Sequence, residues 1–122
     1  MNIYESAEDY LEAILMIKER KGYVRSVDIA DELQYSKASV SVAMKKLREN
    51  GYVSVDSSGA ISLLEPGREI AERIYERHKV LTAIFESIGV DHDIAAKDAC
   101  KVEHDLSPET FKALKKYYQK IK

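Results

Sequence analysis

The sequence predicts a mainly α-helical protein in which one short β-hairpin separates a first part, residues 1–65, from an all-helical second part, residues 66–122. Three observations support this fold class. Apolar residues recur every three or four positions through most of the chain, which is the period of an amphipathic helix. The period falls to two only between Tyr52 and Leu63, where a hairpin fits. The length of 122 residues suits one compact unit or a small domain with a helical extension.

The first predicted helix begins at Ser6, a residue type that caps helix N-termini, and ends at Gly22. Leu11, Ile14 and Ile17 belong to its apolar stripe. Acidic residues near its start and basic residues near its end complement the helix macrodipole. The first part of the chain therefore opens with a well-specified helix.

Two further helices follow, joined by a turn of about three residues, Gln34–Ser36. Ser26 is the expected cap of the earlier helix, and Asn50 with Gly51 ends the later one. The inward positions of the later helix fit the 0, 3, 4, 7 pattern closely and are Val40, Ala43, Met44 and Leu47. Two helices with so short a connection have the layout of a helix-turn-helix.

After Gly51, two runs of alternating apolar and polar residues flank Asp56–Gly59, which has turn chemistry. A hairpin directly after a helix-turn-helix is the wing of a winged helix. A three-helix core with a hairpin can be purely structural, or it can bind another protein. The local charge favours a polyanion as the binding partner, because residues 34–50 hold four basic side chains and one acidic one, a net charge of +3.

The sequence therefore predicts that the first part binds double-stranded DNA through the later helix of the pair. Basic side chains there would contact phosphates, and small side chains at its start would lie near base edges. The predicted DNA-binding residues are Ser36, Lys37, Ala38, Ser39, Ser41, Val42, Lys45 and Lys46.

The second part begins with a long helix from Pro66 to about Ile88. This helix is longer than a small winged domain needs for its own core, so its apolar side predicts a partner. After Gly89, Asp91 or Asp93 caps another helix that is expected to reach Asp105. A last helix starts at residues 107–109 and ends in a basic tail.

Cys100, Glu103 and His104 stand at i, i+3 and i+4, a spacing that puts all three on one helix face. Together they offer sulfur, oxygen and nitrogen to a divalent cation. Three ligands are too few to close a site. Taken singly, each residue is more often an ordinary buried, solvated or capping residue than a metal ligand.

The chain has one cysteine and no apolar run of 18 residues, and its N-terminus is not built like a signal peptide. These features predict a cytoplasmic protein that does not enter a membrane.

Several segments of the chain resemble the diphtheria-toxin-repressor family of metal-dependent transcriptional repressors, especially its short manganese-transport-regulator branch. The resemblance covers nearly the whole chain. The segments that carry it are Ser6-Ala7-Glu8-Asp9-Tyr10-Leu11-Glu12, Val27-Asp28-Ile29-Ala30-Asp31-Glu32-Leu33, Ser39-Val40-Ser41, Arg77-His78, Ile88-Gly89-Val90-Asp91 and Ala99-Cys100-Lys101-Val102-Glu103-His104-Asp105-Leu106-Ser107.

This resemblance implies a homodimeric winged-helix repressor with a DNA-binding domain at 1–65 and a helical metal-binding and dimerisation domain at 66–122. It implies binding to a palindromic operator and repression of metal-uptake genes when the metal is plentiful. The implied ligands of Mn²⁺ or Fe²⁺, with Co²⁺ or Zn²⁺ as substitutes in vitro, are Asp9, Glu12, His78, Cys100, Glu103 and His104.

The chain departs from the manganese branch at Cys100, where that branch has a carboxylate and the iron branch has cysteine. Asp9 follows the manganese branch, since the iron branch commonly has methionine there. A thiolate shifts preference from Mn²⁺ toward Fe²⁺, Co²⁺ or Zn²⁺. The alternative function is a winged-helix transcription factor that senses redox state through Cys100. Catalysis is not expected, because no Gly-rich loop or oxyanion hole accompanies Cys100 and His104.

Overall fold

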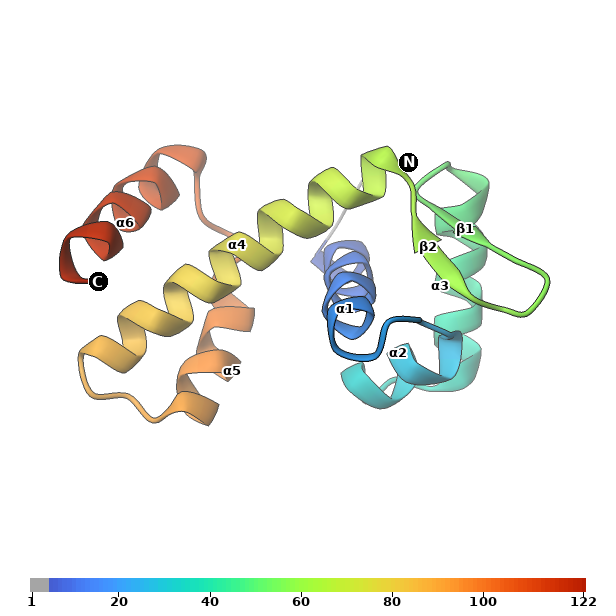
Figure 1. Ribbon diagram of the computed structural model, residues 1–122, viewed down its shortest axis with the longest axis horizontal. Helices are drawn as coiled ribbons and strands as arrows, with labels where there is room; N and C mark the ends of the chain where they lie inside the picture. The colour runs from blue at the N-terminus through green and yellow to red at the C-terminus, as the bar shows by residue number, and fades with distance from the viewer. Residues whose placement is uncertain (1–4) are drawn as a thin grey trace. The chain divides into compact units, whose positions relative to one another are not determined.

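The structure is a computed structural model that describes residues 5–122. It contains six helices and one two-stranded antiparallel sheet within that range, which confirms the mainly helical fold class (Figure 1). The elements are α1 (Glu5–Lys21), α2 (Ser26–Leu33), α3 (Lys37–Glu49), β1 (Val53–Val55), β2 (Ile61–Leu63), α4 (Glu65–Ser87), α5 (His92–Val102) and α6 (Pro108–Ile121).

The chain divides into two compact units, Met1–Glu72 and Arg73–Lys122, and the boundary falls inside α4. In the first unit α1, α2 and α3 pack with the hairpin around a core of buried apolar side chains. The largest fully buried side chains of this core are Leu11, Ile14, Ile17, Ile29, Leu47 and Ile61. Helix α1 ends as predicted at Gly22, which has a φ of 86° and donates its N–H to the Lys18 carbonyl.

Two predicted caps of the first unit are wrong. Ser6 lies inside α1, and the residues before Glu5 lie outside the described part. Ser26 is already helical, and Arg25 is the N-cap of α2. The reason is Asp28, whose Oδ2 accepts the backbone N–H of Arg25 at 2.9 Å and so draws the cap one residue earlier.

The helix-turn-helix is present as predicted, with α2 and α3 joined by residues 34–36. Gln34 adopts a left-handed conformation with φ 58°, and Ser36 caps α3 by accepting the Ser39 N–H at 3.1 Å. Val40, Met44 and Leu47 are buried, as the periodicity predicts.

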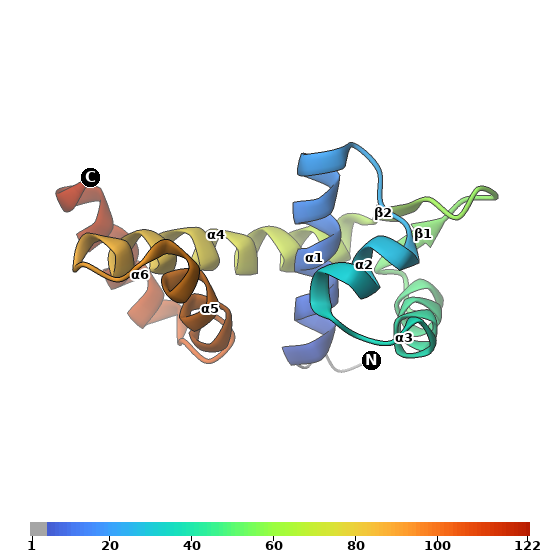
Figure 2. The same cartoon turned by 90° about the horizontal axis from the view of Figure 1, so that it is seen from below.

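The wing pairs β1 with β2 in the register Val53↔Leu63, Ser54↔Ser62 and Val55↔Ile61 (Figure 2). Its turn is closed by Asp56, whose Oδ1 accepts the N–H of Ser58 and of Ala60. The base of the wing packs closely on the start of α4, where a Cβ added at Gly67 would collide with the Tyr52 carbonyl oxygen. Only glycine fits at that position without displacing the helix.

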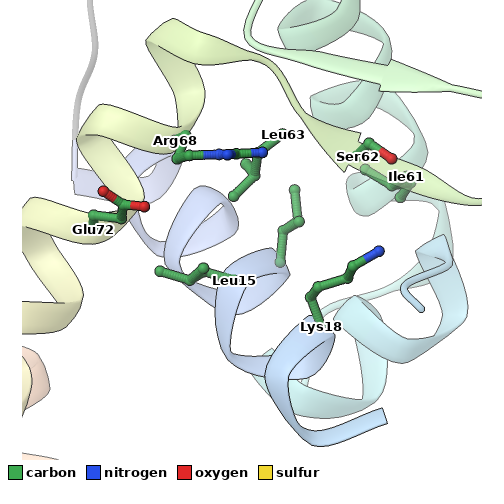
Figure 3. Close-up of a pocket in the computed structure, with 8 residues that line it drawn as sticks. Leu15, Lys18, Ile61, Ser62, Leu63, Arg68 and Glu72 are labelled. Carbon is green, nitrogen blue, oxygen red and sulfur yellow. The ribbon is translucent and has the colours of Figure 1, made fainter. Parts of the chain in front are cut away.

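A cavity of about 270 Å³ lies beside the wing, among α1, β2 and the first turns of α4 (Figure 3). Apolar side chains of α1 and β2 form much of its wall, and Lys18 and Arg68 contribute its positive charge. The lining residues are Ile14, Leu15, Lys18, Ile61, Ser62, Leu63, Arg68 and Glu72.

In the second unit, α5 and α6 lie beside the later turns of α4 (Figures 1 and 2). Gly89, with φ 102°, makes the turn after α4, and Asp91 caps α5 by accepting the Asp93 N–H. Helix α5 ends at Val102 and not at Asp105, because Asp105 donates its N–H to the Val102 carbonyl in a tighter turn. Within the described range, no helix is long and apolar enough to cross a membrane.

Candidate metal centre and DNA-binding face

Helices α4 and α5 bring three of the predicted metal ligands together. His78 lies on α4, Cys100 lies in the last turn of α5, and Glu103 is the residue that caps α5. One ligand atom from each of the three lies within 4.8 Å of the others. The Cys100 Sγ is 3.7 Å from His78 Nδ1.

The carboxylate of Glu103 is fully buried and lies between two imidazoles. Its Oε2 is 3.0 Å from His78 Nδ1, and its Oε1 is 3.5 Å from His104 Nε2. The side chains of His78 and His104 are 12% and 2% exposed, so water screens neither interaction strongly. A buried carboxylate is costly without a positive partner, which indicates that this position serves more than packing.

The donor set fits a divalent transition metal. Imidazole nitrogen, thiolate sulfur and carboxylate oxygen bond such ions at about 2.0–2.3 Å, so two ligands of one ion lie within about 4.5 Å. The separations of 3.0 and 3.7 Å satisfy this limit. The exposed thiol of Cys100 leaves a route for the ion to enter.

The other two predicted ligands lie in the first unit. Asp9 and Glu12 stand three residues apart on α1, so both project from neighbouring positions of one helix face. Carboxylates at this spacing can act together on one cation.

Sequence reasoning gave no role to Arg77, which stands next to His78 and is only 4% exposed. Its Nη1 donates to the carbonyl oxygens of Glu103 and Leu106, at 3.1 and 2.7 Å. The sequence does contain a signal for a role of Arg77, because it is a charged residue within the apolar stripe of α4. The positions of that stripe are Ile70, Ile74, Arg77 and Leu81.

The predicted DNA-binding residues all lie on the exposed side of α3 or at its cap. Val42, in the middle of α3, is 55% exposed. The hydroxyls of Ser36 and Ser39 are hydrogen-bonded to each other at 2.9 Å. The described part of α3 therefore presents small, hydroxylated and basic side chains, which are in chain order Ser36, Lys37, Ala38, Ser39, Ser41, Val42, Lys45 and Lys46.

Two family models match consecutive parts of the chain. Residues 2–61 match the N-terminal DNA-binding domain of the iron-dependent repressors. Residues 64–122 match the metal-binding and dimerisation domain of the same repressors.

Curated relatives agree with these models. An uncharacterised helix-turn-helix transcriptional regulator of Methanocaldococcus jannaschii is 38% identical over 120 residues, which are 97% of this chain and 96% of the relative. The helix-turn-helix transcriptional regulator MntR of Bacillus subtilis is 36% identical over 102 residues, which are 84% of this chain and 72% of the relative.

Solved structures share the fold. A manganese-dependent transcriptional repressor in complex with manganese superposes with a TM-score of 0.84 at 26% identity, over 93% of this chain and 52% of that one. The crystal structure of T. acidophilum IdeR superposes with a TM-score of 0.81 at 22% identity, over 98% of this chain and 55% of that one. This chain thus spans about half the length of both solved proteins.

Proposed function

Because the chain belongs to the iron-dependent repressor family, whose members are metal-dependent DNA-binding regulators of transcription, we propose that it represses metal-homeostasis genes when its metal is bound. The observation that carries this proposal is the buried Glu103 carboxylate, 3.0 Å from His78 Nδ1 and one helical turn from the Cys100 thiol. Such a convergence of three ligand types serves no evident purpose in packing alone.

We assign the ligands as His78, Cys100, Glu103 and His104 from the second unit, with Asp9 and Glu12 from α1. The geometry around Glu103 supports the first group, and the family resemblance supports the carboxylates of α1. The bound ion would supply positive charge among carboxylate and thiolate ligands, which repel one another without it. Because Cys100 contributes a thiolate, Fe²⁺ is expected to be preferred over Mn²⁺, with Co²⁺ and Zn²⁺ able to substitute.

In this proposal, residues 1–65 read DNA, and residues 66–122 supply four of the six metal ligands and form a homodimer. Because the proposed ligands come from both parts, the affinity for the metal depends on how the two parts are arranged. Metal binding then shifts the population toward the arrangement that suits the operator. Two copies of α3 related by a two-fold axis would read a palindromic site whose half-sites lie about one helical turn apart, or a multiple of it.

The face of α3 assigned to DNA is that of Ser36 to Lys46. Lys45 and Lys46 would bind phosphates, and the small side chains at the start of the helix would approach base edges. A DNA-binding regulator needs no catalytic machinery, so we propose no enzymatic activity. Access to the operator places the protein in the cytoplasm.

One observation favours the redox alternative, namely the exposed Cys100 thiol at 3.7 Å from an imidazole nitrogen. Under that alternative, blocking the thiol would change DNA affinity and a chelator would not.

The experiment that separates these functions selects duplexes from a random pool under anaerobic conditions, with Fe²⁺ and with a chelator. The proposal predicts enrichment of an inverted repeat only in the presence of Fe²⁺, and a dimer by light scattering at micromolar concentration. Equal enrichment of one motif in both samples would contradict metal dependence, and enrichment of single half-sites by a monomer would contradict the two-fold mechanism.

A further inference from the structure

The turn that carries Glu103 and His104 lies beyond the regular part of α5, whose last helical residue is Val102. Backbone bonds hold its beginning, since Glu103 donates to the Ala99 carbonyl and Asp105 donates to that of Val102. The carbonyl groups at the end of a helix have no partner within that helix and need donors from elsewhere. The geometry of the proposed ligands therefore depends on what holds this turn.

Arg77 supplies the donors. Its Nη1 carries two hydrogens and donates to the carbonyl oxygens of Glu103, at 3.1 Å, and Leu106, at 2.7 Å. These carbonyls bracket His104, so one amino group joins both ends of the turn to α4. The positive charge also lies at the C-terminal end of α5, where the helix macrodipole favours a cation.

The guanidinium is itself held in place. Phe111 of α6 lies under it, with 5.4 Å between Cζ and the ring centroid, and the Arg77 residue is 4% exposed. A side chain that is locked by an aromatic ring and shielded from water loses little entropy when it binds two carbonyls. Arg77 is thus a rigid connection between α4, the turn after α5 and α6.

We propose that Arg77 is a positioning residue for the metal centre, which holds Glu103 against His78 and keeps His104 beside the same carboxylate. Arg77 and His78 are consecutive on α4, so the helix that presents one ligand also fixes the turn that presents two others. This inference rests on the proposed function, because it assigns those three residues as ligands. Groups that orient ligands in this indirect way typically change metal affinity 10- to 100-fold when they are removed.

The test compares Arg77→Met, which keeps much of the side-chain volume and loses the donors, with Arg77→Lys, which keeps the charge without the planar fork. Arg73→Met is the matched control, because Arg73 is the same residue type one turn earlier on α4 and is exposed. Affinity for Zn²⁺ is measured by competition with a chromophoric chelator. The metal-free proteins are examined by ¹⁵N NMR of the His78 ring, which reports its hydrogen bond to Glu103.

Arg77→Met is expected to bind Zn²⁺ at least 10-fold more weakly than wild type and to lose the His78 signature in the metal-free state, with Arg77→Lys in between. Arg73→Met should match wild type in both respects. Affinities of both Arg77 variants within about threefold of wild type, or an equal loss in Arg73→Met, would overturn the inference. If Arg77→Met does not fold, Arg77→Lys alone decides, and unchanged affinity overturns it. A folded wild-type protein that binds neither Zn²⁺ nor Fe²⁺ would instead refute the proposed metal centre itself.

Discussion

Replacement of Glu103 by glutamine should remove most of the stability that the protein gains from its metal. Glutamine has nearly the same shape as glutamate, but its neutral amide is a poor ligand for a divalent cation. The Glu103 side chain is fully buried, so the substitution removes the negative charge at the metal centre and leaves the surface of the protein unchanged. The expected effect is therefore on metal binding, with the fold retained.

The magnitude follows from linkage. A metal that binds only the folded wild-type protein at 100 times its dissociation constant adds about 2.7 kcal/mol. Loss of a direct ligand should cost at least as much affinity as loss of a group that orients one, which is up to about 100-fold. A loss of about 100-fold in Glu103→Gln brings the same metal concentration to one dissociation constant, where the gain is only about 0.4 kcal/mol. For a chain of this size, 1 kcal/mol corresponds to roughly 3–6 °C in melting temperature, so the metal-induced rise falls from roughly 8–16 °C to about 1–2 °C.

The assay is anaerobic thermal unfolding of each variant with and without Fe²⁺, and only the difference between the two midpoints is compared. Glu109→Gln is the matched control, since it makes the same chemical change at an exposed position of α6 in the same unit. This control should keep the full metal-induced rise. A full rise in Glu103→Gln as well would refute the assignment of Glu103 as a ligand.

Three further predictions concern other parts of the chain. Replacing both Lys45 and Lys46 with alanine should reduce the slope of log K against log salt on the selected duplex by about 0.9 for each phosphate that is no longer neutralised, and an unchanged slope would remove these residues from the DNA face. Gly67→Ala should cost about 1–3 kcal/mol in urea unfolding, because its methyl group would meet a backbone carbonyl just before β1, and unchanged stability would show that α4 can shift there. The Glu86 carboxylate, 3.0 Å from Nδ1, raises the pKa of His92, so this ion pair stabilises the second unit most at pH below about 6.5, and its stabilisation disappears as pH rises through the raised pKa. An NMR titration of His92 should give a higher pKa in wild type than in Glu86→Gln, and equal pKa values would remove Glu86 as the cause.

Elements whose signals are local could be predicted from the sequence. The period of Val40, Met44 and Leu47 predicted the buried face of α3, and Asp56 to Gly59 predicted the turn of the wing. The predicted N-cap of α2 was wrong because a side chain further along the helix determines where the helix begins. Asp28 bonds the backbone of Arg25 and makes it the cap of α2, so the serine beside it, although a good capping residue, lies within the helix.

The candidate site was less accessible to sequence reasoning, because its geometry depends on interactions between distant residues. Spacing alone placed Cys100, Glu103 and His104 near one another, but it could not place His78, which is 25 residues from Glu103 in the chain and 3.0 Å from it in space. The family resemblance supplied that ligand. Neither approach assigned a role to Arg77, whose two hydrogen bonds span 26 and 29 residues.

We propose that the metal is bound through the Cys100 thiolate, with nitrogen and oxygen ligands beside it. Iron K-edge X-ray absorption of the Fe²⁺-loaded protein measures that ligand shell directly. We predict a shell of nitrogen and oxygen atoms and one sulfur atom at a clearly longer distance, and the sulfur contribution should disappear in Cys100→Ser. A shell of nitrogen and oxygen alone in the wild-type protein would contradict this ligand assignment, since Cys100 would then not be a ligand.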